Sequence, residues 1–177
     1  MVLWKGMILG SWVLLGCSGS PRDEFIGTWK PTAGTTTLTC NAAGGDSGAP
    51  GLPPIHGAIT RALPNANTDT WVAGPNGTVV LTNEFGSLTA TVNGGTATLS
   101  SSPGLWLEGF PGTGTVSEPS NLPSGSLSGN VALTTYTFAI DSSSREATET
   151  YAGTVYIAEY GTACALVESA SYQKITD

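Results

Sequence analysis

The sequence predicts an all-β protein, an up-and-down antiparallel barrel of roughly eight to ten strands, with a β-sandwich as the alternative. Its composition favours strands and turns, because only 11% of residues are charged and 24 Gly and 11 Pro interrupt segments rich in Thr, Ser and aliphatic residues. Apolar and polar residues alternate along many short segments, and no useful helical period follows residue 16. Consecutive antiparallel strands would form a meander whose closure brings the first strands beside the last.

Strands are expected wherever this alternation lies between turn-forming residues. The expected strands are residues 25–30, 35–40, 57–63, 69–73, 78–82, 87–92, 95–99, 131–140, 145–151, 153–158 and 163–172. Two segments, residues 41–54 and 102–130, are rich in Gly, Pro and Ser and are expected to be long surface loops. In residues 131–140 the apolar positions change from odd to even numbers, which predicts a bulge near Thr134 or a strand covered on both faces.

The Asn93-Gly94 pair predicts a hairpin with a two-residue loop, because both residues tolerate positive φ. In this register Ala90 would lie opposite Ala97. One face of the hairpin would then be apolar and the other would carry threonines.

The charge of the chain excludes nucleic acid as a partner. Beyond position 17 the chain carries all thirteen acidic residues and five of the six basic ones, a net charge of −8 with histidine neutral. Such a surface repels polyanions and gains nothing from anionic lipid, so attachment to a membrane would need a covalent lipid.

The first sixteen residues are expected to be a signal peptide. Lys5 precedes the apolar residues 6–16. Eleven helical residues extend only about 16 Å, too short for a hydrocarbon core of about 30 Å. We therefore expect residues 1–16 to direct export and to be removed.

Residues 14–17, Leu-Leu-Gly-Cys, resemble the lipobox of bacterial lipoproteins. The resemblance implies that Cys17 becomes the lipidated N-terminus, and Ser18 after it implies sorting to the outer membrane. Residues 17–24 would be the tether and residues 25–177 a single barrel domain. An ordinary signal peptide, which would leave a periplasmic or extracellular protein, is the alternative.

Cys40 and Cys164 remain as an even pair in an oxidising compartment, and a disulfide between them is expected. It would close a loop of about 125 residues. By restricting the unfolded chain, such a bond is expected to stabilise the folded state by roughly 5 kcal/mol. Two separate buried thiols are the alternative. No metal or cofactor is expected, because two cysteines and one distant histidine do not form a tetrahedral zinc site.

Residues 25–29, Phe-Ile-Gly-Thr-Trp, resemble the Gly-x-Trp opening of lipocalin-like barrels. The resemblance implies that Trp29 plugs one end of the barrel beneath the first strand. Lipocalins cover this Trp with an Arg from the last strand, and Lys174 is the basic residue available there. The Thr- and Gly-rich strands are also similar to those of small bacterial lipoproteins of unknown activity. Trp29 as an ordinary core aromatic is the simpler interpretation.

Catalysis is not expected. Residues 45–48, Gly-Asp-Ser-Gly, match the nucleophile segment of trypsin-like proteases, but the single histidine, His56, follows Ser47 by nine residues. Those enzymes need the order His, Asp, Ser. Esterases with a similar N-terminal block need a histidine near the C-terminus, where this chain has none. His56 is expected to be a solvated or hydrogen-bonded imidazole at the start of a strand.

Three acidic positions allow more than one interpretation. Glu149 and Glu168 fall on the inward, apolar phase of their strands, so they form either a polar spot inside the barrel or strand-end groups that reach water. Asp69 alternates with Asn65 and Asn67, a pattern best explained by a turn with side-chain hydrogen bonds.

These observations predict a noncatalytic, membrane-tethered protein of the cell envelope whose barrel binds a small apolar ligand. The alternative is a structural or protein-interaction module of the envelope. Its partners would be the membrane, through the lipid on Cys17, and either the ligand or another envelope protein.

The lipid anchor can be tested with Cys17→Ser. We expect the variant to move from the membrane fraction to the soluble fraction and to incorporate no labelled palmitate, because the thiol that accepts the lipid is gone. A variant that stays in the membrane fraction would contradict the anchor.

Overall fold

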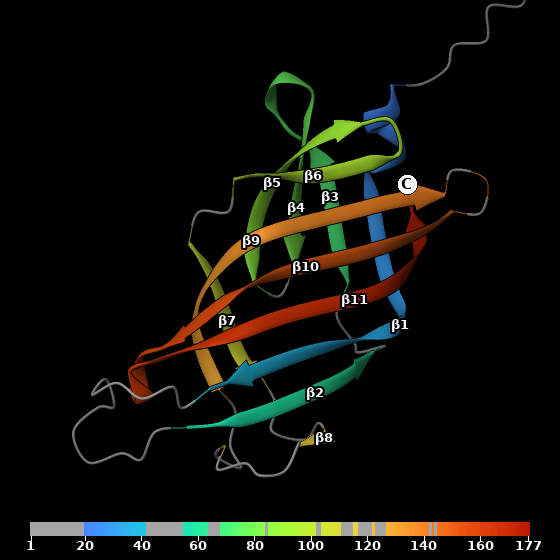
Figure 1. Cartoon of the computed structure of the whole chain (residues 1–177). Coiled ribbons are helices and arrows are strands. Elements are labelled where there is room, and N and C mark those ends of the chain that lie inside the picture. The colour runs from blue at the N-terminus through green and yellow to red at the C-terminus, as the bar shows by residue number, and fades with distance from the viewer. Residues whose placement is uncertain are drawn as a thin grey trace, which may run out of the picture.

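The computed structural model describes residues 20–41, 55–63, 68–83, 85–101, 104–110, 115–116, 122, 127–141, 143 and 145–177. They form a closed, eight-stranded antiparallel barrel, consistent with a lipocalin-like barrel (Figure 1). The strand order around the barrel is β1-β3-β4-β5-β6-β9-β10-β11, and β11 pairs with β1 to close it. The expected barrel is therefore confirmed, and the sandwich is not formed.

The strands and the short 3-10 helices have the following bounds. They are η1 Pro21–Glu24, β1 Gly27–Cys40, β2 Gly57–Leu63, β3 Asp69–Ala73, η2 Pro75–Gly77, β4 Thr78–Asn83, β5 Gly86–Asn93, β6 Thr96–Ser101, β7 Leu105–Phe110, β8 Thr115–Val116, β9 Leu127–Asp141, β10 Glu146–Ile157, η3 Ala158–Tyr160 and β11 Thr162–Thr176. Within the described ranges, none of the helices has the length and apolarity that a membrane crossing requires.

Three further strands extend one end of the barrel. One edge of β1 pairs with β3 through residues 27–29 and with β2 through residues 34–40. β9 likewise pairs with β6 through residues 137–139 and with β7 near its start. Figure 1 shows β2, β7 and β8 at the end of the barrel away from β6. Between its two partners β1 has a short stretch, residues 30–33, that we call the seam.

A cluster of aromatic rings fills the barrel near η1. Phe138 lies at its centre, with ring centroids 5.2 Å from Trp29 and 5.0 Å from Trp71. Trp29 is fully buried and its Nε1 donates a hydrogen bond to the carbonyl of Phe25. Lys174 Nζ lies 5.7 Å from the Trp29 ring centroid, a cation–π distance, so a lysine takes the covering position that the lipocalin resemblance implied for Arg.

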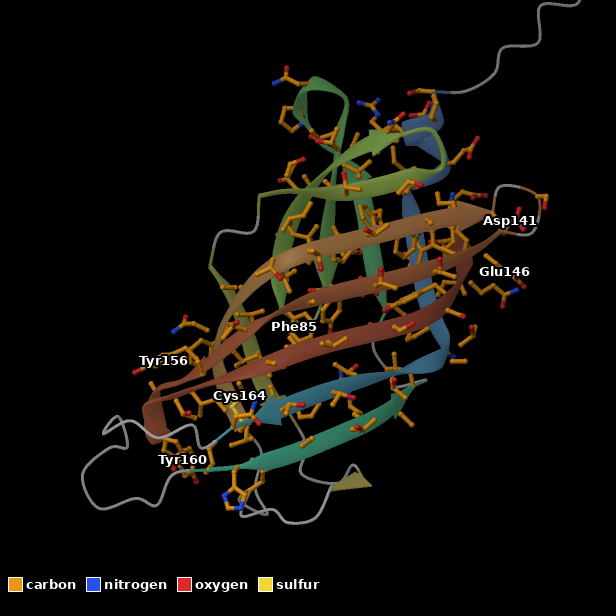
Figure 2. All side chains as sticks on the ribbon, in the orientation of Figure 1. Phe85, Asp141, Glu146, Tyr156, Tyr160 and Cys164 are labelled. Atoms are coloured by element: carbon orange, nitrogen blue, oxygen red, sulfur yellow. A yellow bond between two sulfur atoms is a disulfide. The ribbon has the colours of Figure 1, made fainter. Side chains whose placement is uncertain are left out.

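The opposite end of the barrel is held by a disulfide between Cys40 and Cys164, which confirms that prediction. The two residues pair across β1 and β11, and both are fully buried. Figure 2 labels Cys164 at this end of the barrel. The bond spans 124 positions of the chain and fixes the two strands whose pairing closes the barrel.

The alternation of apolar and polar residues correctly predicted which side chains point into the barrel. It did not predict the register of the β5–β6 hairpin. The β5–β6 loop is Gly94-Gly95, so Ala90 pairs with Leu99 and the predicted Ala97 partner is wrong by two residues. A slip of two residues keeps every side chain on its face, so alternation cannot detect it. The bulge is confirmed, because Thr135 pairs with Ala152 and Leu133 with Gly153, which leaves Thr134 as the extra residue.

One predicted loop is wrong in part. β7, β8 and the start of β9 lie within residues 102–130, where a surface loop was expected. Leu105, Leu107 and Phe110 of β7 are buried, so this strand covers the end of the barrel that β6 does not reach. Beyond Asn41, the other predicted loop, residues 41–54, lies outside the described residues, as do the signal peptide and Cys17.

Removing the disulfide is expected to destabilise the barrel without changing its secondary structure. For Cys40→Ala combined with Cys164→Ala we expect the free energy of unfolding to fall by about 2–5 kcal/mol, because the unfolded chain gains freedom. Urea unfolding followed by circular dichroism measures this. Reducing agent should lower the midpoint of the wild type and leave the double variant unchanged; equal midpoints before reduction would contradict the role of the bond.

Candidate functional site

Three carboxyl groups lie inside the barrel. Asp69 begins β3, Glu149 lies on β10 and Glu168 lies on β11, with exposed fractions of 6%, 1% and 5%. The interior interpretation of Glu149 and Glu168 is therefore correct. Asp69 was expected in a turn and is instead part of this cluster, because pairing of Asp69 with Trp29 directs its side chain inward.

Glu168 is held by hydroxyl groups from three strands. Thr36, Glu168 and Tyr151 are cross-strand neighbours on β1, β11 and β10, and all three are buried. Glu168 Oε2 accepts hydrogen bonds from Thr36 Oγ1 at 2.5 Å and from Tyr151 Oη at 2.8 Å, and Oε1 accepts a long one from Tyr172 Oη at 3.5 Å. These donors suit a negatively charged carboxylate.

Glu149 lies one row away and has no comparable set of donors. Neither its Oε1 nor the hydroxyl of Tyr136 has a well-aligned hydrogen-bond partner among the described residues. Burial, together with the negative charges of Asp69 and Glu168, holds the pKa of Glu149 well above its usual range, although the nearby hydroxyls of Tyr136 and Tyr172 lower it in part. The raised pKa favours the protonated form of Glu149.

The two tyrosines beside Glu149 stay uncharged at neutral pH. Burial is the main cause that raises the pKa of both Tyr136 and Tyr172, and the charges of Glu149 and Asp69 raise it further. Their hydroxyls therefore remain protonated, and able to donate hydrogen bonds, at neutral pH.

A small cavity lies among these groups at the seam. It is bordered by Pro31 on β1, Leu63 at the end of β2 and Asp69 at the start of β3, with Glu149 and Glu168 further in. Its free space is about 20 Å³, room for one water molecule or a group of that size. Apolar ligands of drug size need several hundred Å³. Within the described residues, no three acidic, cysteine or histidine side chains are arranged to bind a metal ion.

A second feature lies on the outer surface. Trp106 on β7 and Tyr156 on β10 are 44% and 48% exposed, and both pair with Asn130 of β9. Figure 2 shows Tyr156 at the same end of the barrel as Cys164, whereas Asp141 and Glu146 lie at the opposite end. We call Trp106 and Tyr156 the aromatic pair.

The structure brings together some of the candidate residues: Cys40 bonds to Cys164, and Glu149 and Glu168 line one cavity. Cys17 and Ser47 lie outside the described residues. His56 directly precedes β2 and is partly buried, and it is not among the described side chains that line the cavity. No pattern in the sequence groups Asp69 with Glu149 and Glu168, because strands far apart in the chain position them.

No protein-family model, no curated protein and no solved structure matches the chain. Its function is therefore inferred from the barrel, the polar cavity and the aromatic pair.

The raised pKa of Glu149 predicts how stability depends on pH. Above about pH 4.5, the ordinary pKa, folded Glu149 keeps a proton that the unfolded chain releases, so its contribution to the free energy of unfolding falls as pH rises. The loss is at most about 1.4 kcal/mol per pH unit, until the pH reaches the raised pKa. Glu149→Gln cannot ionise and should escape this loss.

We expect Glu149→Gln to match the wild type near pH 4 and to become progressively more stable than it toward pH 8. Urea unfolding across this range measures the difference. Glu146→Gln, an exposed change on the same strand, is the matched control and should leave the pH dependence unchanged. A constant difference between Glu149→Gln and wild type would show that Glu149 is ionised inside the barrel.

Proposed function

We propose that the protein is a noncatalytic lipoprotein of the cell envelope, held at the outer membrane by a lipid on Cys17, whose barrel surface binds another envelope protein. The lipobox resemblance and the net charge of −8 beyond position 17 support the lipid as the means of attachment. The barrel then serves as a rigid scaffold that presents its outer face. This is the interaction-module alternative from the sequence.

The observation that carries this choice is the filled interior of the barrel. Large rings pack against Phe138 at one end, a disulfide closes the other, and the cavity beside Glu149 has space for only one water-sized group. An apolar ligand would have to displace that core. The geometry therefore favours the outer surface over the interior as the place where a protein-sized partner binds.

The aromatic pair is the part of the outer face best suited to a protein partner. Tryptophan and tyrosine are the side chains that contribute most often to protein interfaces, because each combines a large apolar area with a polar group. The two lie two strands apart, about 10 Å between backbones, so one partner surface can contact both. The aromatic pair lies at the end of the barrel where Cys40 and Cys164 are bonded. This end is remote from η1, which is the first described element after Cys17.

Crosslinking in intact cells tests this function. We expect a reproducible protein adduct that is lost when Trp106→Ala and Tyr156→Ala are combined, because the partner loses its main apolar contacts. Val72→Ala on β3, a change of an equally exposed apolar residue elsewhere, is the control and should keep the adduct.

An adduct of equal yield in both variants would place the partner elsewhere. Absence of any protein adduct from wild-type cells would contradict the interaction function itself.

A further inference from the structure

The polar cavity contains a deeply buried carboxyl group whose hydrogen bonding is incomplete. Glu149 lines the cavity with 1% of its surface exposed, and its Oε1 has no well-aligned hydrogen-bond partner among the described residues. The neighbouring carboxyl of Glu168 is fully engaged by three hydroxyls. A buried polar atom without a partner is costly, which favours a bound group that supplies the missing hydrogen bond.

The charges around the cavity select a cation. Asp69, Glu149 and Glu168 contribute three carboxyl groups, and Arg61 is the one cation among the described lining residues. The Arg61 guanidinium lies 5.2 Å from the centroid of the Phe110 ring, which it covers. An anion would face three carboxyl groups. A metal ion is disfavoured because the described acidic side chains do not converge on one point.

The shape of the cavity limits the size of that cation. Free space of about 20 Å³ accommodates a single water-sized head, such as an ammonium group. Arg61 and Asn83 are partly exposed and lie on the solvent side, whereas Glu149 is the most deeply buried of the three carboxyl groups. Pro31, Leu63 and Phe85 supply apolar wall, which suits a short carbon chain behind the charged head.

We propose that this cavity binds a small primary amine in its ammonium form, with the ammonium group donating hydrogen bonds to Glu149. On binding, the Glu149 carboxyl releases its proton to solvent and becomes the carboxylate that pairs with the ammonium group. No covalent bond between amine and protein forms. The site goes beyond the proposed interaction function, because it uses the barrel interior and not the aromatic pair.

The groups facing Glu149 explain the coupled proton release. Tyr136 on β9 and Tyr172 on β11 are neutral donors, and Tyr151 on β10 donates to Glu168. The charged groups are Asp69 on β3, Glu168 on β11 and Arg61 on β2. An added positive charge among them favours ionised Glu149, so the pKa of Glu149 falls and affinity for the amine rises with pH.

Calorimetric titration of the full-length chain with methylammonium chloride tests the proposal. We expect one proton released per amine bound, measured in two buffers of different ionisation enthalpy, and affinity that rises up to about tenfold per pH unit while free Glu149 is protonated. Tetramethylammonium chloride at equal ionic strength should give no binding, because it has no N–H group and is too large. Potassium chloride should likewise give no binding heat, because the potassium ion has no N–H group to donate.

Two matched variants test whether Glu149 is the group that releases the proton on amine binding. Glu149→Gln should lose the proton release and the pH dependence, whereas Glu146→Gln should keep both. Equal binding of tetramethylammonium or potassium, binding to wild type without proton release, or no binding at pH 8 would each overturn the proposal. Proton release by the wild type is decisive even where Glu149→Gln does not fold. The crosslinking result with the aromatic pair is independent of all these outcomes.

Discussion

The pairing of β1 with β11 is the constraint on which the rest of the structure depends. It runs from Thr28 opposite Thr176 to Cys40 opposite Cys164, and it joins the first and last strands of the sheet. A closed sheet pairs β1 on both sides except at the seam, and it separates an inside from an outside. The Lys174 contact over Trp29 covers one end of this pairing and the disulfide holds the other.

Closure of the sheet also determines which hydrogen bonds the inward polar side chains can make. Glu168 lies between Thr36 and Tyr151 in one row of the closed sheet, so two hydroxyls reach its carboxylate from neighbouring strands. Glu149 lies in the next row, between Phe138 and Ala170, which offer no donor. Two glutamates with the same pattern in the sequence thus differ in their hydrogen bonding, because only Glu168 has hydroxyl donors directly opposite it on both neighbouring strands.

Much of the fold was predictable because it rests on local patterns. The bounds of β2 and β3 match the expected segments, and the change of phase in β9 correctly located the bulge at Thr134. Hairpin register was not predictable, since alternation has a period of two and a two-residue slip preserves it. β7 was missed because it lies in a Gly- and Pro-rich segment, and its burial depends on the gap that β6 leaves beside β9.

The sequence by itself determined the all-β class and the inward phase of Glu149 and Glu168, because both follow from periodicity, and the even count of remaining cysteines predicted the disulfide that the structure confirms. Only the tertiary structure decided that Asp69 joins the two glutamates, that the cavity has the size of one water molecule, and that Trp106 and Tyr156 lie on one outer face. Each of these depends on contacts between strands far apart in the chain. Such contacts form only when the sheet closes.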